Sequence, residues 1–313
     1  MSRRPAHPAL TALGAVGAVG VACAVWGIGI ERYLFTVREA TAAALPPGSA
    51  PLRVLHISDA HMAPWQRRKQ QWLASLADLE PDLIVNTGDN LGHRDGLAGL
   101  RRAFEPFAGV PGVFVHGSND VHEPTPKNPL LYFSGPSESH ADPDLLDTAA
   151  LDAFLSDELG WADLNNTAAS VQVGGRRLDF FGVSDAHREW DDLDALPGAI
   201  ARLGERDAAT PLLGVTHAPY QRVLNRFTDL GAQAIFGGHT HGGQVCLPFY
   251  GALVANCDIP LKQAKGLSAW THGGRSIPLN VSAGIGHSIY APVRFACRPE
   301  ATLLTLTARD TPA

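Results

Sequence analysis

Short, almost purely apolar segments recur along the chain and alternate with amphipathic stretches, and this alternation constrains the fold more than any other feature. Residues 52–57, 83–85 and 113–115 are predicted strands, separated by predicted helices over 66–79 and 96–107. Strands that are apolar along their whole length are typical of sheets buried on both faces, with the intervening helices as covers. The sequence therefore predicts an α/β fold.

The same alternation continues to the end of the chain. A helix is predicted near 148–159, and further strands are predicted near 169–173, 177–183, 212–215, 234–236, 277–282 and 301–307. Residues 124–143 interrupt the pattern with prolines, serines and aspartates. We expect this segment to be an excursion over one face, which either shapes a substrate pocket or is a disordered surface insertion.

The N-terminal segment contains the longest apolar run. No charged residue occurs from Pro8 to Ile30, and this run exceeds the roughly 20 residues with which a helix crosses a bilayer core of ~30 Å. We predict a membrane anchor or signal segment over residues 1–32, a linker rich in small residues and proline over 33–51, and a single domain over 52–313.

A retained anchor is the favoured interpretation of this segment. A cleaved secretory signal is the main alternative, because 22–24 and 42–44 both read as Ala-x-Ala cleavage sites. A buried helix of a soluble protein is the third. The first two interpretations export the domain, so the expected location is the cell membrane, as a single-pass protein with an extracytoplasmic domain.

Composition limits the classes of partner. The chain is 45% hydrophobic and 18% charged, which excludes bulk disorder. Its 25 Lys and Arg against 31 Asp and Glu give a net charge of −6, so we expect no nucleic-acid binding. Cys246, Cys257 and Cys297 lie in the predicted domain. We favour three buried thiols over one bridged pair.

Polar residues follow the predicted strands at the points where the strands end. In chain order these are Asp59, His61, Asp89, Asn119, His217, His239 and His241. The carboxyl ends of parallel strands meet at one crevice, which is the usual ligand site of such a sheet. Asp59 with His61, and His239 with His241, are two residues apart. An extended backbone would direct both members of each pair the same way.

These residue types point to a metal centre. Imidazole and carboxylate ligands without thiolates suit borderline divalent ions such as Mn, Fe or Zn. Seven ligands are too many for one ion and suit two ions that share a carboxylate. Two ions ~3.5–4 Å apart activate a water and stabilise both oxygens in a phosphoryl displacement. The sequence thus predicts two divalent metal ions as cofactors.

The motif set resembles the calcineurin-like metallophosphoesterase family over roughly residues 52–307. The matching pieces, in the family's order, are Asp59-Ala-His61, Gly88-Asp89-Asn90, Asn119-Asp120, His217 and Gly238-His239-Thr-His241. The resemblance implies a four-layer sandwich of two mixed β-sheets flanked by helices, here with an N-terminal transmembrane helix. It also implies that Asp59, His61 and His241 hold one ion, that Asn119, His217 and His239 hold the other, and that Asp89 bridges them.

The anchor together with His-Thr-His-Gly-Gly-Gln is similar to the bacterial membrane-associated branch of this family. That resemblance implies a metal-dependent hydrolase of phosphate esters or pyrophosphates at the cell envelope, in which metal-activated hydroxide attacks phosphorus. The expected partners are a phosphorylated small molecule or a lipid or cell-envelope substrate, and the membrane itself through the N-terminal helix. Cleavage of UDP-2,3-diacylglucosamine is an analogy within this branch.

The third motif departs from the family pattern. The family usually carries Gly-Asn-His there, with the His as proton donor to the leaving group, whereas this chain reads Gly117-Ser118-Asn119-Asp120. Aligning Asn119 with the ligand puts Asp120 in the catalytic position; the other register makes Ser118 the ligand, and hydroxyls are poor ligands for such metals. We expect catalytic roles for Asp120 and Asn119, with His122 or His187 as a substitute donor.

Other polar residues receive weaker expectations. Asn90 and His187 are candidate substrate contacts, although a surface-loop role for His187 is equally favoured. His56 and His116 lie within predicted strands, where packing roles are expected. The basic run 67–69 is expected to be a solvated helix face, with a lipid-headgroup contact as the alternative.

Two rival functions are weighed against the phosphoesterase. A metal-dependent amidohydrolase would carry its His-x-His after the first strand, whereas here that pair is the last motif. A membrane-anchored metal-containing binding or sensor module is the second rival. Loss of a general acid typically costs ~10²–10⁴-fold in rate, so the missing His would favour weak or absent turnover.

Overall fold

Two six-stranded sheets form the centre of the protein in this computed structural model, which describes residues 8–126, 143–207 and 209–310. The first sheet has the order β1 (Thr36–Leu45), β14 (Glu300–Ala308), β2 (Leu52–Ile57), β3 (Leu83–Asn86), β4 (Gly112–Phe114) and β5 (Ala162–Asp163). The second has the order β12 (Gly266–His272), β13 (Arg275–Val281), β9 (Ala234–Gly237), β8 (Leu212–Thr216), β7 (Arg176–Val183) and β6 (Thr167–Val173). A separate hairpin pairs β10 (Cys246–Leu247) with β11 (Gly251–Ala252).

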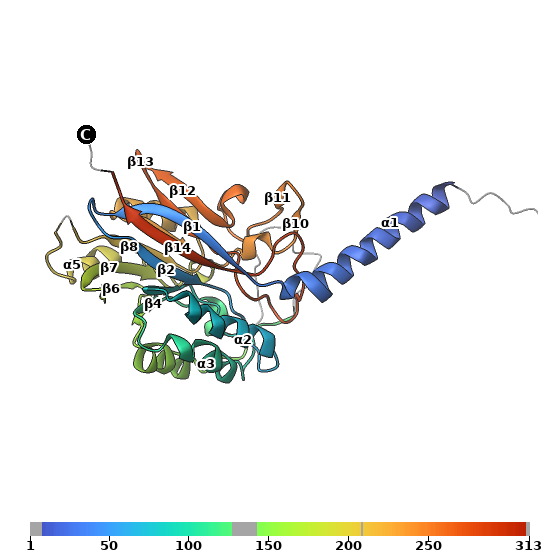
Figure 1. Cartoon of the computed structure of the whole chain (residues 1–313), viewed down its shortest axis with the longest axis horizontal. Helices are drawn as coiled ribbons and strands as arrows, with labels where there is room; N and C mark the ends of the chain where they lie inside the picture. The colour runs from blue at the N-terminus through green and yellow to red at the C-terminus, as the bar shows by residue number, and fades with distance from the viewer. Residues whose placement is uncertain (1–7, 127–142, 208, 311–313) are drawn as a thin grey trace, which may run out of the picture.

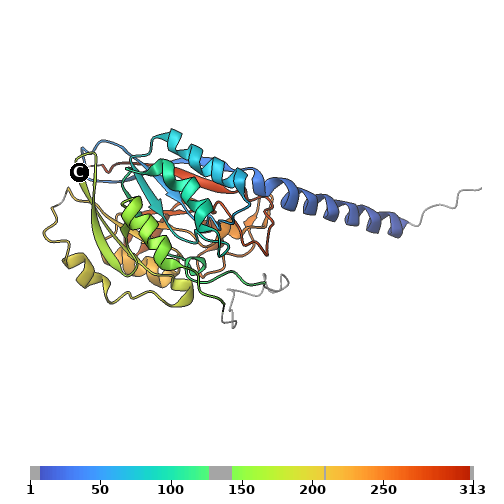
Figure 2. The same cartoon turned by 90° about the horizontal axis from the view of Figure 1, so that it is seen from below.

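Helices cover the outer faces of the sheets (Figures 1 and 2). The helices of the body are α2 (Arg67–Ser75), α3 (Leu97–Phe104), α4 (Thr148–Asp152), α5 (Leu196–Ala201) and α6 (Gln221–Asp229). Short 3-10 or π-helical turns lie at Leu76–Leu79, Glu105–Phe107, Ser118–Asp120, Ala153–Glu158, Ala186–Arg188, His241–Gly243 and Leu261–Gln263.

The alternation of side chains along each strand builds three cores. Val54 of β2 packs between the two sheets together with Phe180 and Val215 of the second sheet. Its neighbour Leu55 points the opposite way and packs in the core that also contains Leu100 of α3. Successive strand residues face opposite sides of a sheet, so each strand serves two layers. A third core joins the second sheet to α6, and the predicted four-layer α/β sandwich is confirmed.

The expected linker over 33–51 is wrong for its central part. Residues Thr36–Leu45 form β1, which pairs in parallel with β14 along its length. The segment TAAAL contains small residues that are poor strand formers, and its pairing partner lies at the far end of the chain. Residues 46–51 alone form the connection to β2.

The excursion expected over 124–143 lies mostly at 127–142, outside the described residues. The four cysteines, Cys23, Cys246, Cys257 and Cys297, are free thiols. Cys246 and Cys297 are buried as expected, whereas Cys257 is half-buried.

The N-terminal helix α1 (Pro8–Ala24) projects from the body, as Figures 1 and 2 show. It continues through a π-helical turn (Val25–Ile30) and a 3-10 turn (Glu31–Tyr33). The stretch Ala12–Tyr33 is long and apolar enough to cross a membrane, and its most apolar part is almost entirely exposed. A membrane span and a signal sequence both fit this helix.

Candidate metal centre

The candidate ligands project from loops that follow strands of both sheets. Asp59 and His61 follow β2, Asp89 follows β3, Asn119 follows β4, His217 follows β8, and His239 and His241 follow β9. The first sheet thus contributes four of these side chains and the second sheet three. The site lies where the carboxyl ends of the two sets of parallel strands meet.

The backbone at the paired ligands differs from the extended form expected. Asp59 and His61 have φ of 51° and 40°, and His239 and His241 have φ of 64° and 49°. Non-glycine residues seldom occupy this left-handed region, at a cost of order 1–3 kcal/mol each. Each ligand pair is therefore brought together by a tight left-handed turn after the strand.

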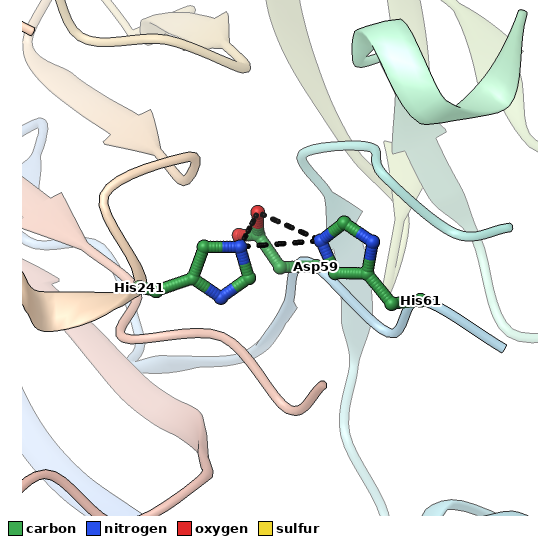
Figure 3. Close-up of side chains that lie close together, drawn as sticks. All are labelled: Asp59, His61 and His241. Carbon is green, nitrogen blue, oxygen red and sulfur yellow. Dashed lines mark hydrogen bonds and ion pairs between the residues drawn. The ribbon is translucent and has the colours of Figure 1, made fainter. Parts of the chain in front are cut away.

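The first group of ligand atoms joins the two sheets (Figure 3). His61 Nε2 and His241 Nε2 lie 3.2 Å apart, and Asp59 Oδ1 lies 3.5 Å from His241 Nε2 and 4.0 Å from His61 Nε2. The three ligand atoms lie within 4.8 Å of one another and could hold one ion.

The second group shares Asp59 with the first. Asp59, Asp89 and His217 also offer atoms within 4.8 Å of one another. Asp89 Oδ2 lies 3.6 Å from His217 Nε2 and 3.4 Å from His61 Nε2, so this carboxylate contacts both groups. His217 Nδ1 lies 2.7 Å from the Thr87 carbonyl oxygen. That bond fixes the tautomer in which Nε2 carries a lone pair facing the carboxylates.

Unsatisfied polar atoms support a metal at these groups. Asp59 Oδ1 and His217 Nε2 are buried and have no hydrogen-bond partner among the described residues. Buried polar atoms are normally paired, because an unpaired one loses the free energy of its hydration. Orphaned carboxylate and imidazole atoms that converge on one volume fit the donor set of a borderline divalent ion.

The electrostatics of the site favour a bound cation. Burial raises the pKa of the Asp59 carboxyl to about 7 and lowers the pKa of the His61 imidazole to about 4. Burial also lowers the pKa of His241 well below its usual value. At His217 burial acts in the same direction, but neighbouring carboxylates, Asp89 foremost, outweigh it and raise the pKa to about 9. A proton on His217 therefore takes the place that a divalent ion would occupy, and metal binding would displace it.

Asn119 contacts the shared carboxylate. Its backbone N–H donates to Asp89 Oδ1 at 2.8 Å, and its Nδ2 donates to Asp89 Oδ2 at 2.7 Å. A Cβ at Gly117 would overlap the Asp89 carboxylate, so only glycine permits this close approach of the two loops. The loop after β4 thus orients Asp89.

His239 lies at the edge of the second group. Its ring centroid is 5.1 Å from that of His217 and 4.4 Å from that of His187. Its Nε2 lies 3.1 Å from the Asn256 carbonyl oxygen, and its backbone N–H donates to Asp59 Oδ2 at 3.1 Å. The ring is therefore next to the ligand groups, while its Nε2 contacts Asn256.

The expected roles of Asp120 and Asn90 conflict with their contacts. Asp120 is fully buried, and its carboxylate accepts from the backbone N–H groups of Asn90, Leu91 and Gly117 at 2.7, 3.2 and 3.1 Å. Asn90 is also fully buried, and its side-chain oxygen accepts from Asn86 Nδ2 at 2.8 Å. These side chains hold the loops after β3 and β4 in register. They contact each other, the backbone, and the side chains of Asn86 and His116.

The two candidate substitute donors are positioned differently. The His187 ring packs against the His239 ring in a tilted arrangement, and its Nδ1 lies 3.0 Å from the Tyr220 hydroxyl. His122 instead packs its ring 5.6 Å from the ring of Trp190, and none of its described contacts is with a candidate ligand. The geometry thus favours His187 over His122 for a place beside the ligand groups.

The packing roles expected for two histidines agree with their contacts. His56 Nε2 lies 3.0 Å from Thr87 Oγ1, and its Nδ1 lies 2.7 Å from Asn280 Nδ2. His116 Nε2 lies 2.6 Å from Asp152 Oδ1. Neither ring joins the ligand groups.

Two buried cations near the site were not anticipated from the sequence. Arg294 is fully buried; its Nη1 donates to the carbonyl oxygens of Ala283 at 2.7 Å and His241 at 3.2 Å. Lys69 is 5% exposed and donates to the Ala60 carbonyl oxygen at 2.6 Å, so its place in a solvated helix face was wrong. Arg294 has no motif around it, and its partner His241 is distant in sequence. Lys69, in contrast, lies in α2, the helix that directly follows the first ligand loop.

Comparison with known proteins agrees with this arrangement. Residues 52–243 match the family model described as calcineurin-like phosphoesterase. The chain is 24% identical over 296 residues to an uncharacterized metallophosphoesterase, YkuE, of Bacillus subtilis, covering 90% of each chain. It is 26% identical over 268 residues to the phosphodiesterase YaeI of Escherichia coli, covering 82% of this chain and 83% of the relative.

Among solved structures, protein TT1561 of Thermus thermophilus is 14% identical with a TM-score of 0.41, and the match covers 75% of this chain and 91% of that one. The family-model match extends from β2 through the last ligand loop, and therefore over every candidate ligand. The chain belongs to the calcineurin-like phosphoesterase family, whose members are metal-dependent phosphoester hydrolases.

Proposed function

We propose that the protein is a membrane-anchored phosphoesterase that uses two divalent metal ions and acts at the cell envelope, outside the cytoplasm. The observation that carries the proposal is the pair of overlapping ligand groups, which share Asp59 and are both contacted by Asp89. The anchored location is supported by the exposed apolar stretch Ala12–Tyr33.

We assign the ligands as follows. Asp59, His61 and His241 hold one ion, Asn119, His217 and His239 hold the other, and Asp89 bridges the two. Two ions in such a site supply a water of lowered pKa and neutralise the charge that develops on the phosphoryl oxygens. Asn119 orients the bridging carboxylate through two hydrogen bonds. Arg294 and Lys69 hold the carbonyl oxygens of the two ligand loops.

The proton donor to the leaving group is assigned to His187. Its ring lies beside His239, and the Tyr220 hydroxyl at 3.0 Å fixes the ring's orientation. This assignment replaces Asp120, whose oxygens are occupied by backbone N–H groups. Because His187 comes from a different loop than the usual donor, we expect substrates with good leaving groups, such as pyrophosphates and aryl esters, to be preferred.

The substrate class is a phosphate ester or pyrophosphate of an envelope component. One relative is named a phosphodiesterase, so diesters belong in the first assays. A lipid-linked pyrophosphate of the UDP-2,3-diacylglucosamine type is one member of this class. The anchored location favours substrates that reside in the membrane or at its surface.

The test is turnover by the full chain in neutral detergent, loaded with Mn and assayed on nitrophenyl mono- and diesters. Activity that is lost in Asp89→Asn and kept in the exposed-site control Asp78→Asn is the expected result. Bound metal with no turnover on any ester would overturn the enzyme assignment in favour of a binding or sensor module. Failure to bind metal would overturn both.

A further inference from the structure

A cavity with both polar and apolar lining lies where the N-terminal helix meets the body. It has a volume of about 240 Å³ and is lined by Tyr33, Leu34, Phe35, Arg68, Trp72 and Arg298. These residues come from the end of the apolar stretch, from α2 and from the segment before β14. None of them is a candidate metal ligand, so this cavity is separate from the metal centre.

Three guanidinium groups gather around this cavity. Arg68 and Arg298 line it, and the Arg32 guanidinium carbon lies 4.4 Å above the centre of the Tyr33 ring. Arg68 approaches the same ring at 5.9 Å. No ion pair joins any of these arginines to an acidic side chain within the described ranges, and Arg32 Nε is buried without a hydrogen-bond partner there.

The carboxylate of Glu31, the acidic residue next to this cluster, is hydrogen bonded to other groups. The Glu31 carboxylate accepts from the backbone N–H groups of Ala296 at 3.0 Å and Cys297 at 2.8 Å, and from Trp26 Nε1 at 2.7 Å. The positive charge of the cavity therefore has no counterion within reach among the described residues. An unpaired, partly desolvated cluster of guanidinium groups is a site for an anion, and the planar donors of Arg suit phosphate oxygens.

The position of the cavity at the end of the apolar stretch indicates where its anion would come from. Tyr33 ends the stretch that is long enough to span a bilayer, so in the membrane-anchored protein proposed above the cavity would open at the level of the lipid headgroups. The Phe35 and Trp72 rings stack with centroids 5.1 Å apart beside it. Aromatic side chains concentrate at this depth of a membrane protein, because their rings suit the boundary between hydrocarbon and water.

The hairpin of β10 and β11 adds apolar surface at the same end of the molecule (Figure 1). Leu247, Phe249 and Tyr250 are exposed at its tip. At the base of the hairpin, the Cys246 backbone N–H donates a hydrogen bond to the Phe295 carbonyl oxygen at 2.8 Å. The adjacent Arg294 N–H donates to the Gly27 carbonyl oxygen at 3.1 Å, so the hairpin and the N-terminal helix are attached to one loop.

We propose that the cavity lined by Arg68 and Arg298 binds the phosphate group of an anionic lipid headgroup, and thereby fixes the depth and orientation of the body on the membrane. The lipid's acyl chains run beside the exposed Ile28 and Ile30, and the hairpin tip enters the headgroup layer. The proposal shares with the proposed function only the membrane location. It requires neither metal nor turnover.

The test measures phosphatidylglycerol binding by the full chain in neutral detergent, by native mass spectrometry after metal is removed with a chelator. Each basic residue near an anionic surface contributes about fivefold in affinity, so the double variant Arg68→Gln with Arg298→Gln should bind at least about tenfold more weakly. The control Arg202→Gln with Arg206→Gln removes the same charge at exposed positions outside the cavity and should bind as the parent does. Phosphatidylcholine should bind weakly to all three.

Separate arms identify the source of the phosphate and guard against misfolding. Millimolar inorganic phosphate should leave the lipid bound; displacement of the lipid would overturn the lipid assignment in favour of a free anion. Two further results would overturn the lipid assignment: equal affinity of the cavity variant and the control variant for phosphatidylglycerol, or equal affinity of the parent for phosphatidylglycerol and phosphatidylcholine. Metal binding by the cavity variant should match the parent, which shows that it folds. Asp89→Asn should keep lipid binding even if it loses turnover, so the two proposals fail independently.

Discussion

Asp120 shows how burial changes the role of a residue that the motif marks as catalytic. It occupies the motif position of the family's proton donor, yet its carboxylate accepts from three backbone N–H groups of two ligand loops. Burial and hydrogen-bond geometry cannot be read from a four-residue motif. The motif therefore singled out the position, and the structure shows a carboxylate that joins the loops after β3 and β4.

We predict that Asp120→Asn lowers the free energy of unfolding by about 3 kcal/mol, because an amide group replaces an ionised acceptor of buried N–H groups. Urea titration of metal-free protein measures this change. Asp78→Asn, at an exposed site, should unfold as the parent does. An unchanged stability of Asp120→Asn would show that these hydrogen bonds do not hold the loops.

His187 provides a kinetic prediction at the same scale. His187→Gln should lower kcat on alkyl phosphate esters by about 10²-fold or more, with little effect on nitrophenyl esters, whose leaving group needs no proton. The ratio of kcat values on the two ester classes is the measurement. His122→Gln should leave the ratio unchanged; a shift with His122→Gln and none with His187→Gln would reverse the assignment.

The raised pKa of His116 predicts that the stability of the folded protein falls as the pH rises. Burial opposes its charge, but the carboxylates of Asp120, 3.5 Å from its Nδ1, and of Asp152, 2.6 Å from its Nε2, outweigh burial and raise its pKa to about 10. Because the pKa of His116 is higher in the folded state than in the unfolded state, its protonation stabilises the fold. This stabilisation is fully present at pH values below the unfolded-state pKa near 6.5, and it is lost as the pH rises through the folded-state pKa.

The free energy of unfolding of the metal-free protein should therefore fall by roughly 2 to 4 kcal/mol between pH 6 and pH 10 through this group. His116→Gln should remove that part of the decline, as measured by urea titrations at both pH values. A variant with the full decline of the parent would show that His116 is not charged in the folded state.

At the scale of elements, most strands of the body were predictable because short apolar runs signal buried strands directly, whereas the two-sheet sandwich was implied by the resemblance of the motif set to the family. The strand β1 was not, because its alanines carry little strand preference and its partner β14 is distant in sequence. The left-handed turns after β2 and β9 were also missed. These turns bring together ligands from different strands. Such contacts between distant segments leave no local sequence pattern.

Adjacent alanines in β1 test this strand. Ala44 is fully buried in the core between the sheets, whereas Ala43 is exposed. Ala44→Asp should destabilise the protein by about 3 kcal/mol or more, because it buries a charge without a partner, while Ala43→Asp should be nearly neutral. Thermal and urea unfolding distinguish the two. Equal, small effects would restore the linker interpretation.

At the scale of the whole molecule, the N-terminal segment and the body are one structure rather than an anchor on a loose tether. Cleavage at Ala42-Ala43-Ala44 would remove β1 from the first sheet. It would also remove Glu31, which caps the loop that contains Arg294 and, through Arg294, supports His241. The sequence indicated an apolar segment of spanning length, but its attachment to the loop that contains Arg294 depends on contacts between opposite ends of the chain.

We therefore predict that the mature chain keeps its N-terminal helix. In cells it should stay in the membrane fraction through an alkaline carbonate wash, and its intact mass should include the residues of helix α1, Pro8–Ala24. Release into the soluble fraction with a new N-terminus at Leu45 would contradict this account of the molecule. Protease treatment of spheroplasts should digest the body, because the domain is proposed to lie outside the cytoplasm.

The number of metal ions bound per chain tests the central claim most directly. Elemental analysis of the full chain, equilibrated with Mn and freed of excess, should give two ions per chain, and Asp89→Asn should bind fewer because the bridging carboxylate is lost. Asp78→Asn should bind two. A parent protein that binds none, or an Asp89→Asn variant that still binds two as tightly as the parent, would contradict a centre built around a shared Asp89.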